Sequence, residues 1–155
     1  FIGGGAGKPK IKFDEALTQI KDNAEFIFQH EYITHKELPY FLKDKDIFVF
    51  ASSCENMPNT LIEGMASGLS IACSNRGPMP EVLKDGGVYF NPENVKDIEK
   101  AISIIIENLD ERERIAQRAE ELSKAYSWAR CSKETFEFLV EIASQNKKSL
   151  NEITK

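Results

Sequence analysis

Two carboxylates stand on either side of a predicted helix start. Glu55 and Glu63 have seven residues between them, and the polar loop 52–58 leads into a helix expected from about Asn59. A carboxylate that accepts hydrogen bonds from two adjacent hydroxyls makes the stronger, charge-assisted kind of bond. The pair therefore predicts a ligand that is rich in hydroxyl groups.

The start of this helix is also predicted to bind an anion. The backbone N–H groups of Asn59, Thr60 and Leu61 are expected to be unpaired there, with the positive end of the helix dipole behind them. Such an arrangement suits a diphosphate. Acidic residues disfavour a nearby phosphate unless they bind a neutral part of the same ligand, and sugar hydroxyls are such a part. A nucleotide sugar carries both groups, so the loop predicts a nucleotide-sugar site.

The elements that must position this loop follow from the apolar pattern of the chain. Continuously apolar segments alternate with helical patterns, which favours a parallel sheet covered on both faces, the doubly wound α/β arrangement. The expected strands are 25–28, 47–50, 69–73 and 88–90. Ligands of such sheets bind beyond the carboxyl ends of the strands. The loop 52–58 follows a strand and therefore lies at that edge.

The helices of this arrangement are predicted from their period and their capping residues. Thr34 and Glu37 form a capping box ahead of one helix. Asn94, Asp110 and Ser127 are expected to cap three later helices. The remaining helical segments are 13–22, the stretch from Asn59 to Gly68, and one turn at 81–84.

Composition narrows the class of protein. The 155 residues have 41% hydrophobic content, and 20 basic against 25 acidic residues are interspersed, which argues against nucleic acid as a partner. No apolar stretch approaches the roughly 18 residues of a membrane span. The three cysteines have no C-x-x-C spacing, so neither a disulfide framework nor a zinc site is expected. We expect a cytoplasmic protein, and the start at Phe1 in what resembles a strand end suggests a fragment.

Three other kinds of site that the sequence could indicate each lack a required residue or spacing. The segment from Gly3 to Lys8 lacks the Ser or Thr that a Walker phosphate loop needs after its lysine. His30 and His35 are five residues apart, whereas two zinc ligands on one helical face stand four apart. Cys54 has no histidine placed to activate it as a nucleophile. We therefore expect no metal.

Together these residues resemble the retaining GT-B glycosyltransferases (glycosyl transferases group 1, family 4). The stretch S-x-x-E-x-x-P-N-x-L-I-E-x-M-A-x-G, from Ser52 to Gly68, is similar to the donor loop and following helix of that family. Further segments are similar as well, so the resemblance covers almost the whole chain. These segments are Glu37-Leu38, 46–49, Gly77 with 80–82, 86–88 and Ser127-Trp128.

The resemblance implies a Rossmann-like fold, the C-terminal half of a GT-B enzyme. Residues 1–155 would form one nucleotide-sugar-binding domain, with the N-terminal acceptor domain absent and the segment of about 127–147 packing back toward it. Glu63 would bind the ribose hydroxyls and Glu55 the transferred sugar near the reacting carbon. The other donor-binding residues implied are Gly3, Gly4, Gln29, His30, Tyr32, Met57, Pro58, Asn59, Thr60 and Leu61.

The activity implied is retaining transfer of a hexosyl group from a nucleoside diphosphate to an acceptor, in polysaccharide, lipopolysaccharide or other glycoconjugate synthesis. The resemblance implies no cofactor and no obligatory metal, and the isolated fragment is expected to be inactive. The protein could lie at the inner face of a membrane, with any membrane contact made by the absent half. Two alternatives remain at this point: half of a non-hydrolysing nucleotide-sugar epimerase, and a non-catalytic binding domain of flavodoxin type.

Overall fold

The computed structural model describes residues 1–3, 7–20 and 25–153, with the side chains of residues 9 and 146–153 excepted. The chain divides into two compact units, Phe1–Asp44 and Lys45–Lys155. None of the described helices combines the length and the apolar character that crossing a bilayer requires.

The first unit contains helix α1 (Lys8–Gln19) and helix α2 (Leu38–Lys43). Helix α1 starts earlier than the predicted 13–22, because Pro9 is accommodated in its first turn, where no intrahelical N–H bond is lost. Asp14, the expected cap, lies inside α1 and pairs with Lys10. Residues 21–22 of the predicted helix lie outside the described residues.

The strand predicted at 25–28 is wrong. Glu25 and Phe26 belong to a 3₁₀ turn, and the side chains of Phe26 and Phe28 are 73% and 68% exposed. An apolar run forms a buried strand only where other elements cover it. The strand-like pairing found in the described part of this unit is a parallel bridge between Ile2 and His30.

The second unit is built on a parallel sheet. Its described strands are β1 (Ile47–Phe50), β2 (Ser70–Ser74) and β3 (Val88–Phe90), in the order β1-β2-β3. Phe50 pairs with Cys73, and Cys73 pairs with Tyr89. The strands predicted at 47–50 and 88–90 are confirmed, and the one predicted at 69–73 lies one residue later.

The helices of this unit are α3 (Asn59–Ala66), α4 (Met79–Leu83), α5 (Val95–Glu107), α6 (Leu109–Ser123) and α7 (Trp128–Ile153). The predicted cap Asn94 accepts from the Lys96 N–H at 3.0 Å, and Ser127 Oγ accepts from the Arg130 N–H at 3.2 Å. The predicted cap Asp110 is wrong. Asn108 caps α6 instead, since its extended backbone ends α5 and lets its Oδ1 accept from the Glu111 N–H at 3.0 Å.

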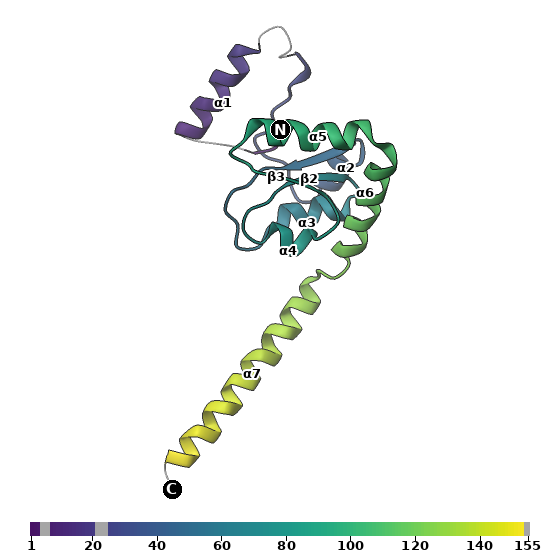
Figure 1. Ribbon diagram of the computed structural model, residues 1–155. Helices are drawn as coiled ribbons and strands as arrows, with labels where there is room; N and C mark the ends of the chain where they lie inside the picture. The colour runs from purple at the N-terminus through teal and green to yellow at the C-terminus, as the bar shows by residue number, and fades with distance from the viewer. Residues whose placement is uncertain (4–6, 21–24, 154–155) are drawn as a thin grey trace. The chain divides into compact units, whose positions relative to one another are not determined.

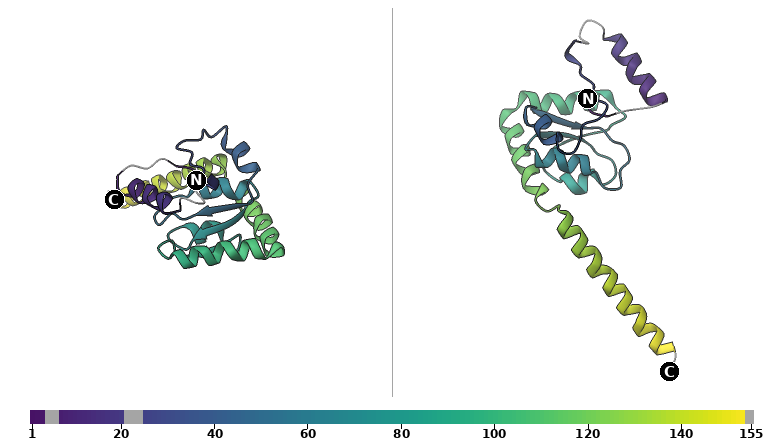
Figure 2. Two further views of the ribbon diagram at one scale, coloured as in Figure 1. Left: turned by 90° about the horizontal axis from the view of Figure 1, so that it is seen from above. Right: turned by 180° about the vertical axis from the view of Figure 1, so that it is seen from behind.

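Two apolar cores cover the two faces of the sheet. On one face, Ile71 and Cys73 of β2 pack with residues of α3 and α4. On the other face, Ala72 packs with residues of α5. Figure 1 shows α5 on one side of the strands and α3 and α4 on the other, and the reverse view in Figure 2 shows the same order of layers. This is the doubly wound α/β arrangement that the sequence predicts.

Helix α7 exposes all of its described side chains. It ends at Ile153, beyond the predicted range of about 127–147. Its large apolar residues include Trp128, which is 81% exposed, and Phe136, which is 69% exposed. The other exposed large apolar side chains of α7 are Phe138, Leu139, Val140 and Ile142.

Candidate functional site

The loops that follow the three strands meet at one edge of the sheet. They are 51–58 after β1, 75–78 after β2 and 91–94 after β3. The N–H of Asn75 donates to the Phe90 carbonyl at 2.9 Å, which joins the second loop to the end of β3. A Cβ built on Gly77 would lie 4.0 Å from the Glu55 carbonyl oxygen, so the second loop also lies against the first. The three loops therefore form one surface at the carboxyl edge.

Glu55 lies in the first of these loops and is half-buried. The Ser52 hydroxyl donates to Glu55 Oε1 at 2.7 Å. This bond fixes the orientation of the carboxylate. Within the described residues, Oε2 accepts no hydrogen bond, so the carboxylate keeps an acceptor for a ligand hydroxyl.

Glu63 lies on α3 and is also half-buried. Its neighbour Gly64 is buried, and a Cβ built there would lie 2.7 Å from Cδ1 of the Phe48 ring. Only a glycine therefore allows α3 to approach β1 this closely. The segment that follows β1 thus carries both predicted carboxylates, one on its loop and one on its helix.

The predicted set of unpaired amides at the start of α3 is corrected by the structure. The Asn59 N–H donates to the Met57 carbonyl at 2.9 Å, and the Leu61 N–H donates to the Pro58 carbonyl at 3.0 Å. The tight turn before α3 brings these loop carbonyls within reach, so neither amide is unpaired. The Thr60 N–H donates to no described residue and is therefore the amide of the predicted set that is unpaired.

The side chains of this segment also differ in accessibility. Met57 is 45% exposed, and Asn59 and Thr60 are exposed, so all three are accessible to a ligand. Pro58 and Leu61 are buried, and Leu61 belongs to the core between α3 and the sheet. The side chains of Pro58 and Leu61 are therefore not accessible to a ligand.

Three of the site residues predicted in the first unit come together. The Gly3 N–H donates to the His30 carbonyl at 2.9 Å, and Gln29 Nε2 donates to the Gly3 carbonyl at 3.4 Å. The His30 ring packs edge-on against Phe41, with ring centres 4.8 Å apart. Tyr32 is 81% exposed. Gly4 lies outside the described residues.

Arg76 lies in the loop after β2 and is not among the site residues predicted from the sequence. Its Nη2 donates to Asn91 Oδ1 at 3.4 Å and lies 3.6 Å from Glu93 Oε2. The available signal was a basic residue directly before Gly77 in a loop that follows a strand. Its contacts with the loop after β3 depend on the fold and could not be seen in the sequence.

The cysteines are all free thiols. Burial raises the pKa of the Cys73 thiol to about 12, so this group stays protonated at neutral pH. Cys54 is exposed beside Glu55. Within the described residues, no group of three or more His, Cys, Asp or Glu side chains is arranged to hold a metal ion.

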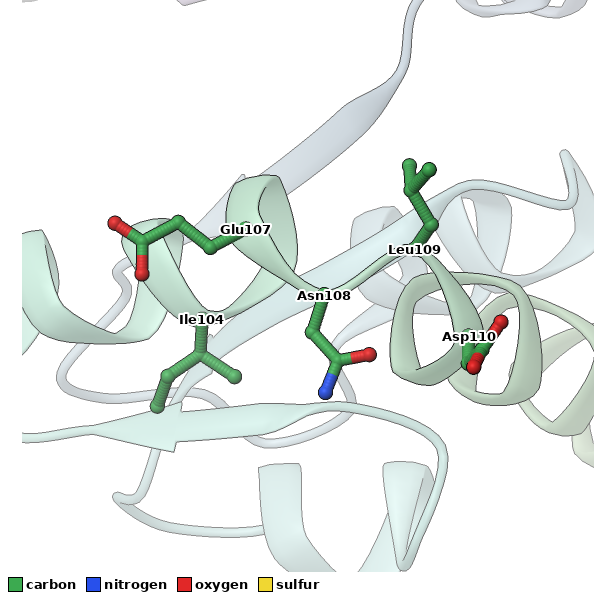
Figure 3. Close-up of a pocket in the computed structure, with 5 residues that line it drawn as sticks. All are labelled: Ile104, Glu107, Asn108, Leu109 and Asp110. Atoms are coloured by element: carbon green, nitrogen blue, oxygen red, sulfur yellow. The ribbon is translucent and has the colours of Figure 1, made fainter.

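An open hollow of about 540 Å³ lies away from these loops, where α5 meets α6. It is lined by Ile104, Glu107, Asn108, Leu109 and Asp110, and Figure 3 shows Ile104 and Asn108 pointing to one side while Leu109 points to the other. The Ser70 hydroxyl donates to the Arg112 carbonyl at 2.9 Å, which places the start of α6 beside the first residue of β2. The hollow therefore lies at the amino edge of the sheet, away from the loops that carry the predicted site residues.

Comparisons with known proteins identify the class. Residues 1–122 match the sequence model of the family described as "Glycosyl transferases group 1". This match covers more than half of the chain, and the chain belongs to that family. The match favours the transferase interpretation over the epimerase and flavodoxin-type alternatives.

One curated relative and two solved structures illustrate the likeness. The chain is 30% identical to O-antigen chain mannosyltransferase B of Escherichia coli over 104 residues, which cover 67% of this chain and 27% of that protein. Sucrose-phosphate synthase from Thermosynechococcus elongatus has a TM-score of 0.78 at 17% identity, over 93% of this chain and 38% of that one. Anabaena HepE in complex with UDP has a TM-score of 0.75 at 17% identity, over 90% of this chain and 40% of that one.

These likenesses confirm the predicted fold class, a Rossmann-like domain of the kind that forms the C-terminal half of GT-B glycosyltransferases. The chain spans 27% of the length of the mannosyltransferase and 38% to 40% of the two solved chains.

Proposed function

We propose that this chain binds the nucleotide-sugar donor of a retaining glycosyltransferase of hexosyl-transferring type. Another domain of the same polypeptide would bind the acceptor. The observation that carries the proposal is the loop after β1, where Ser52 orients the half-buried carboxylate of Glu55 at the carboxyl edge of the sheet. Membership of the group 1 family and the likeness to a protein solved in complex with UDP support it.

Each part of the donor has a proposed partner. Glu63 binds the ribose hydroxyls, and the Thr60 N–H with the dipole of α3 binds the diphosphate. Met57 and Asn59 line the same segment, with Pro58 and Leu61 supporting it. In the first unit, the proposed donor-binding residues are Gly3, Gly4, Gln29, His30 and Tyr32. The proposed chemistry uses no cofactor and no obligatory metal.

Glu55 is proposed to position the transferred sugar. Its charged oxygen accepts from a sugar hydroxyl near the reacting carbon and favours the positive charge that develops there in an oxocarbenium-like transition state. The bond from Ser52 holds the carboxylate in place before the sugar binds. A group oriented in advance loses less entropy during the reaction.

The exposed helix α7 fits the same proposal. Its apolar side chains, such as Trp128 and Phe136, form a surface that an additional domain of the polypeptide would cover. We propose that this is the acceptor-binding domain and that the chain alone is inactive in transfer. The whole enzyme is proposed to act in glycoconjugate synthesis in the cytoplasm, at the inner face of a membrane where the acceptor requires it.

Calorimetric titration of the chain with UDP, GDP and ADP tests donor binding. The change Glu63→Ala is expected to weaken binding by about 1.5 to 3 kcal/mol, the range for a hydrogen bond to a charged group. Glu113→Ala is the matched control, since Glu113 is an exposed glutamate on α6. Equal binding by the chain and its Glu63→Ala variant would remove Glu63 from the site, and no binding of any nucleotide would contradict the proposed function.

A further inference from the structure

The carboxyl-edge loops contain more acidic than basic residues. The loops 51–58, 75–78 and 91–94 contain three charged residues, Glu55, Glu93 and Arg76. Arg76 therefore carries the one positive charge of these loops. Two of the three α3 amides expected to bind an anion are already bonded within the loop. A diphosphate at this edge therefore needs a further donor of positive charge.

The backbone of Arg76 is fixed next to the Glu55 loop. Its N–H donates to the hydroxyl of Ser74, the buried last residue of β2, at 3.2 Å. The next residue, Gly77, has φ of 52° and lies against the Glu55 carbonyl. Arg76 is thus one residue from the contact between the two loops.

The side chain of Arg76 is held only weakly. Its bond to Asn91 is 3.4 Å long, and its ion pair with Glu93 is 3.6 Å long. The side chains of Arg76 and Glu93 are 47% and 75% exposed. Exposed ion pairs of this length contribute little to stability. The guanidinium can therefore exchange these partners for a more strongly charged one.

We propose that Arg76 is a phosphate-binding residue for the donor, an inference that rests on the proposed function of the site. On donor binding, the guanidinium exchanges Glu93 for oxygens of the diphosphate, which its planar N–H groups match as a two-point contact. As the sugar leaves, negative charge grows on the diphosphate, and the arginine stabilises it. The loop after β2 then binds the phosphates from a second side, opposite the contribution of α3.

The test separates a phosphate contact from a structural tie between loops. The chain and its Arg76→Gln, Arg76→Lys and Glu93→Gln variants are titrated with UDP and GDP and with the nucleosides uridine and guanosine. Arg76→Gln is expected to weaken diphosphate binding about tenfold, as for one charge-assisted hydrogen bond, and to leave nucleoside binding unchanged. Arg76→Lys keeps the charge without the two-point contact and should lose less. Glu93→Gln frees the guanidinium and should strengthen diphosphate binding.

The matched control is Arg112→Gln, on α6 at the other edge of the sheet, which should bind as the unaltered chain does. The inference is overturned if Arg76→Gln binds the diphosphate as tightly as the unaltered chain, or if it loses nucleoside and diphosphate binding in equal proportion. If Arg76→Gln does not fold, Arg76→Lys decides, and an unchanged diphosphate affinity overturns the inference. Failure of the unaltered chain to bind any of these nucleotides is a different result, which contradicts the proposed function itself.

Discussion

Helix α3 begins differently from helices α5 and α6. An asparagine side chain caps each of the latter, Asn94 at α5 and Asn108 at α6. Helix α3 has Pro58 at the corresponding position and no side-chain cap. The capped helices start outside the loop that carries Glu55, whereas α3 starts at the end of that loop. A side-chain cap uses amides at a helix start, whereas at α3 loop carbonyls take two of them and leave the Thr60 N–H unpaired among the described residues, so packing rather than a cap positions this helix.

The largest expected effect tests whether packing positions α3. Gly64→Ala places a Cβ 2.7 Å from the Phe48 ring. We expect it to lower the free energy of unfolding by about 1 to 3 kcal/mol, as overpacking does. Urea denaturation measures the loss.

A double-mutant cycle provides the control for this prediction. In a Phe48→Leu background the added methyl group meets a smaller side chain, so Gly64→Ala should cost less there. An identical loss in both backgrounds would show that the Phe48 contact does not set the position of α3.

A smaller loss of stability is expected when the side-chain cap of α6 is removed. Asn108→Ala removes the bond to the Glu111 N–H and should lower the free energy of unfolding by about 1 kcal/mol. Asp110→Ala removes only a favourable charge in the first turn of α6 and should cost less. Thermal unfolding of both variants measures the difference, and the reverse order would return the capping role to Asp110.

The smallest effect concerns a third kind of helix start, the charged capping box before α2. The Thr34 hydroxyl donates to Glu37 Oε2 at 2.6 Å, and this bond lowers the pKa of Glu37 below its ordinary value of 4.5. The stability from this pair is therefore fully present above pH 4.5 and is lost as the pH falls through the lower folded pKa. The asparagine caps have no such dependence.

NMR titration of Glu37 in the chain and in Thr34→Ala measures this effect. The variant should titrate closer to the ordinary value, because it lacks the hydroxyl donor. The same midpoint in both proteins would mean that Thr34 does not stabilise the Glu37 carboxylate.

The sequence predicts correctly those elements whose structure depends on residues nearby in the chain. The strands at 47–50 and 88–90 are predicted correctly because helices adjacent in sequence cover them. The strand predicted at 25–28 is wrong because burial depends on distant partners, and Phe26 and Phe28 are exposed. Asp110 and Asn108 are both good capping residues, and only the backbone conformation decides between them.

The same reasoning applies to the candidate site. The loop of Glu55 and the helix of Glu63 follow from local pattern. The paired state of the Asn59 and Leu61 amides depends on where the loop carbonyls lie. The position of Arg76 beside Asn91 depends on a tie between two loops fifteen residues apart in sequence. Such contacts are products of the folded chain and leave no periodic signal.

Helix α6 belongs to both faces of the sheet, since Ala119 packs in one core and Ile115 in the other. These residues stand about one turn apart on α6, so neither layer can separate from β2 without disturbing this one helix. The two layers are therefore mechanically linked, and the described core of this unit is expected to melt as one cooperative block. A substitution near the loop after β1 is consequently expected to alter packing on the opposite face of the sheet as well, because α6 packs in both cores.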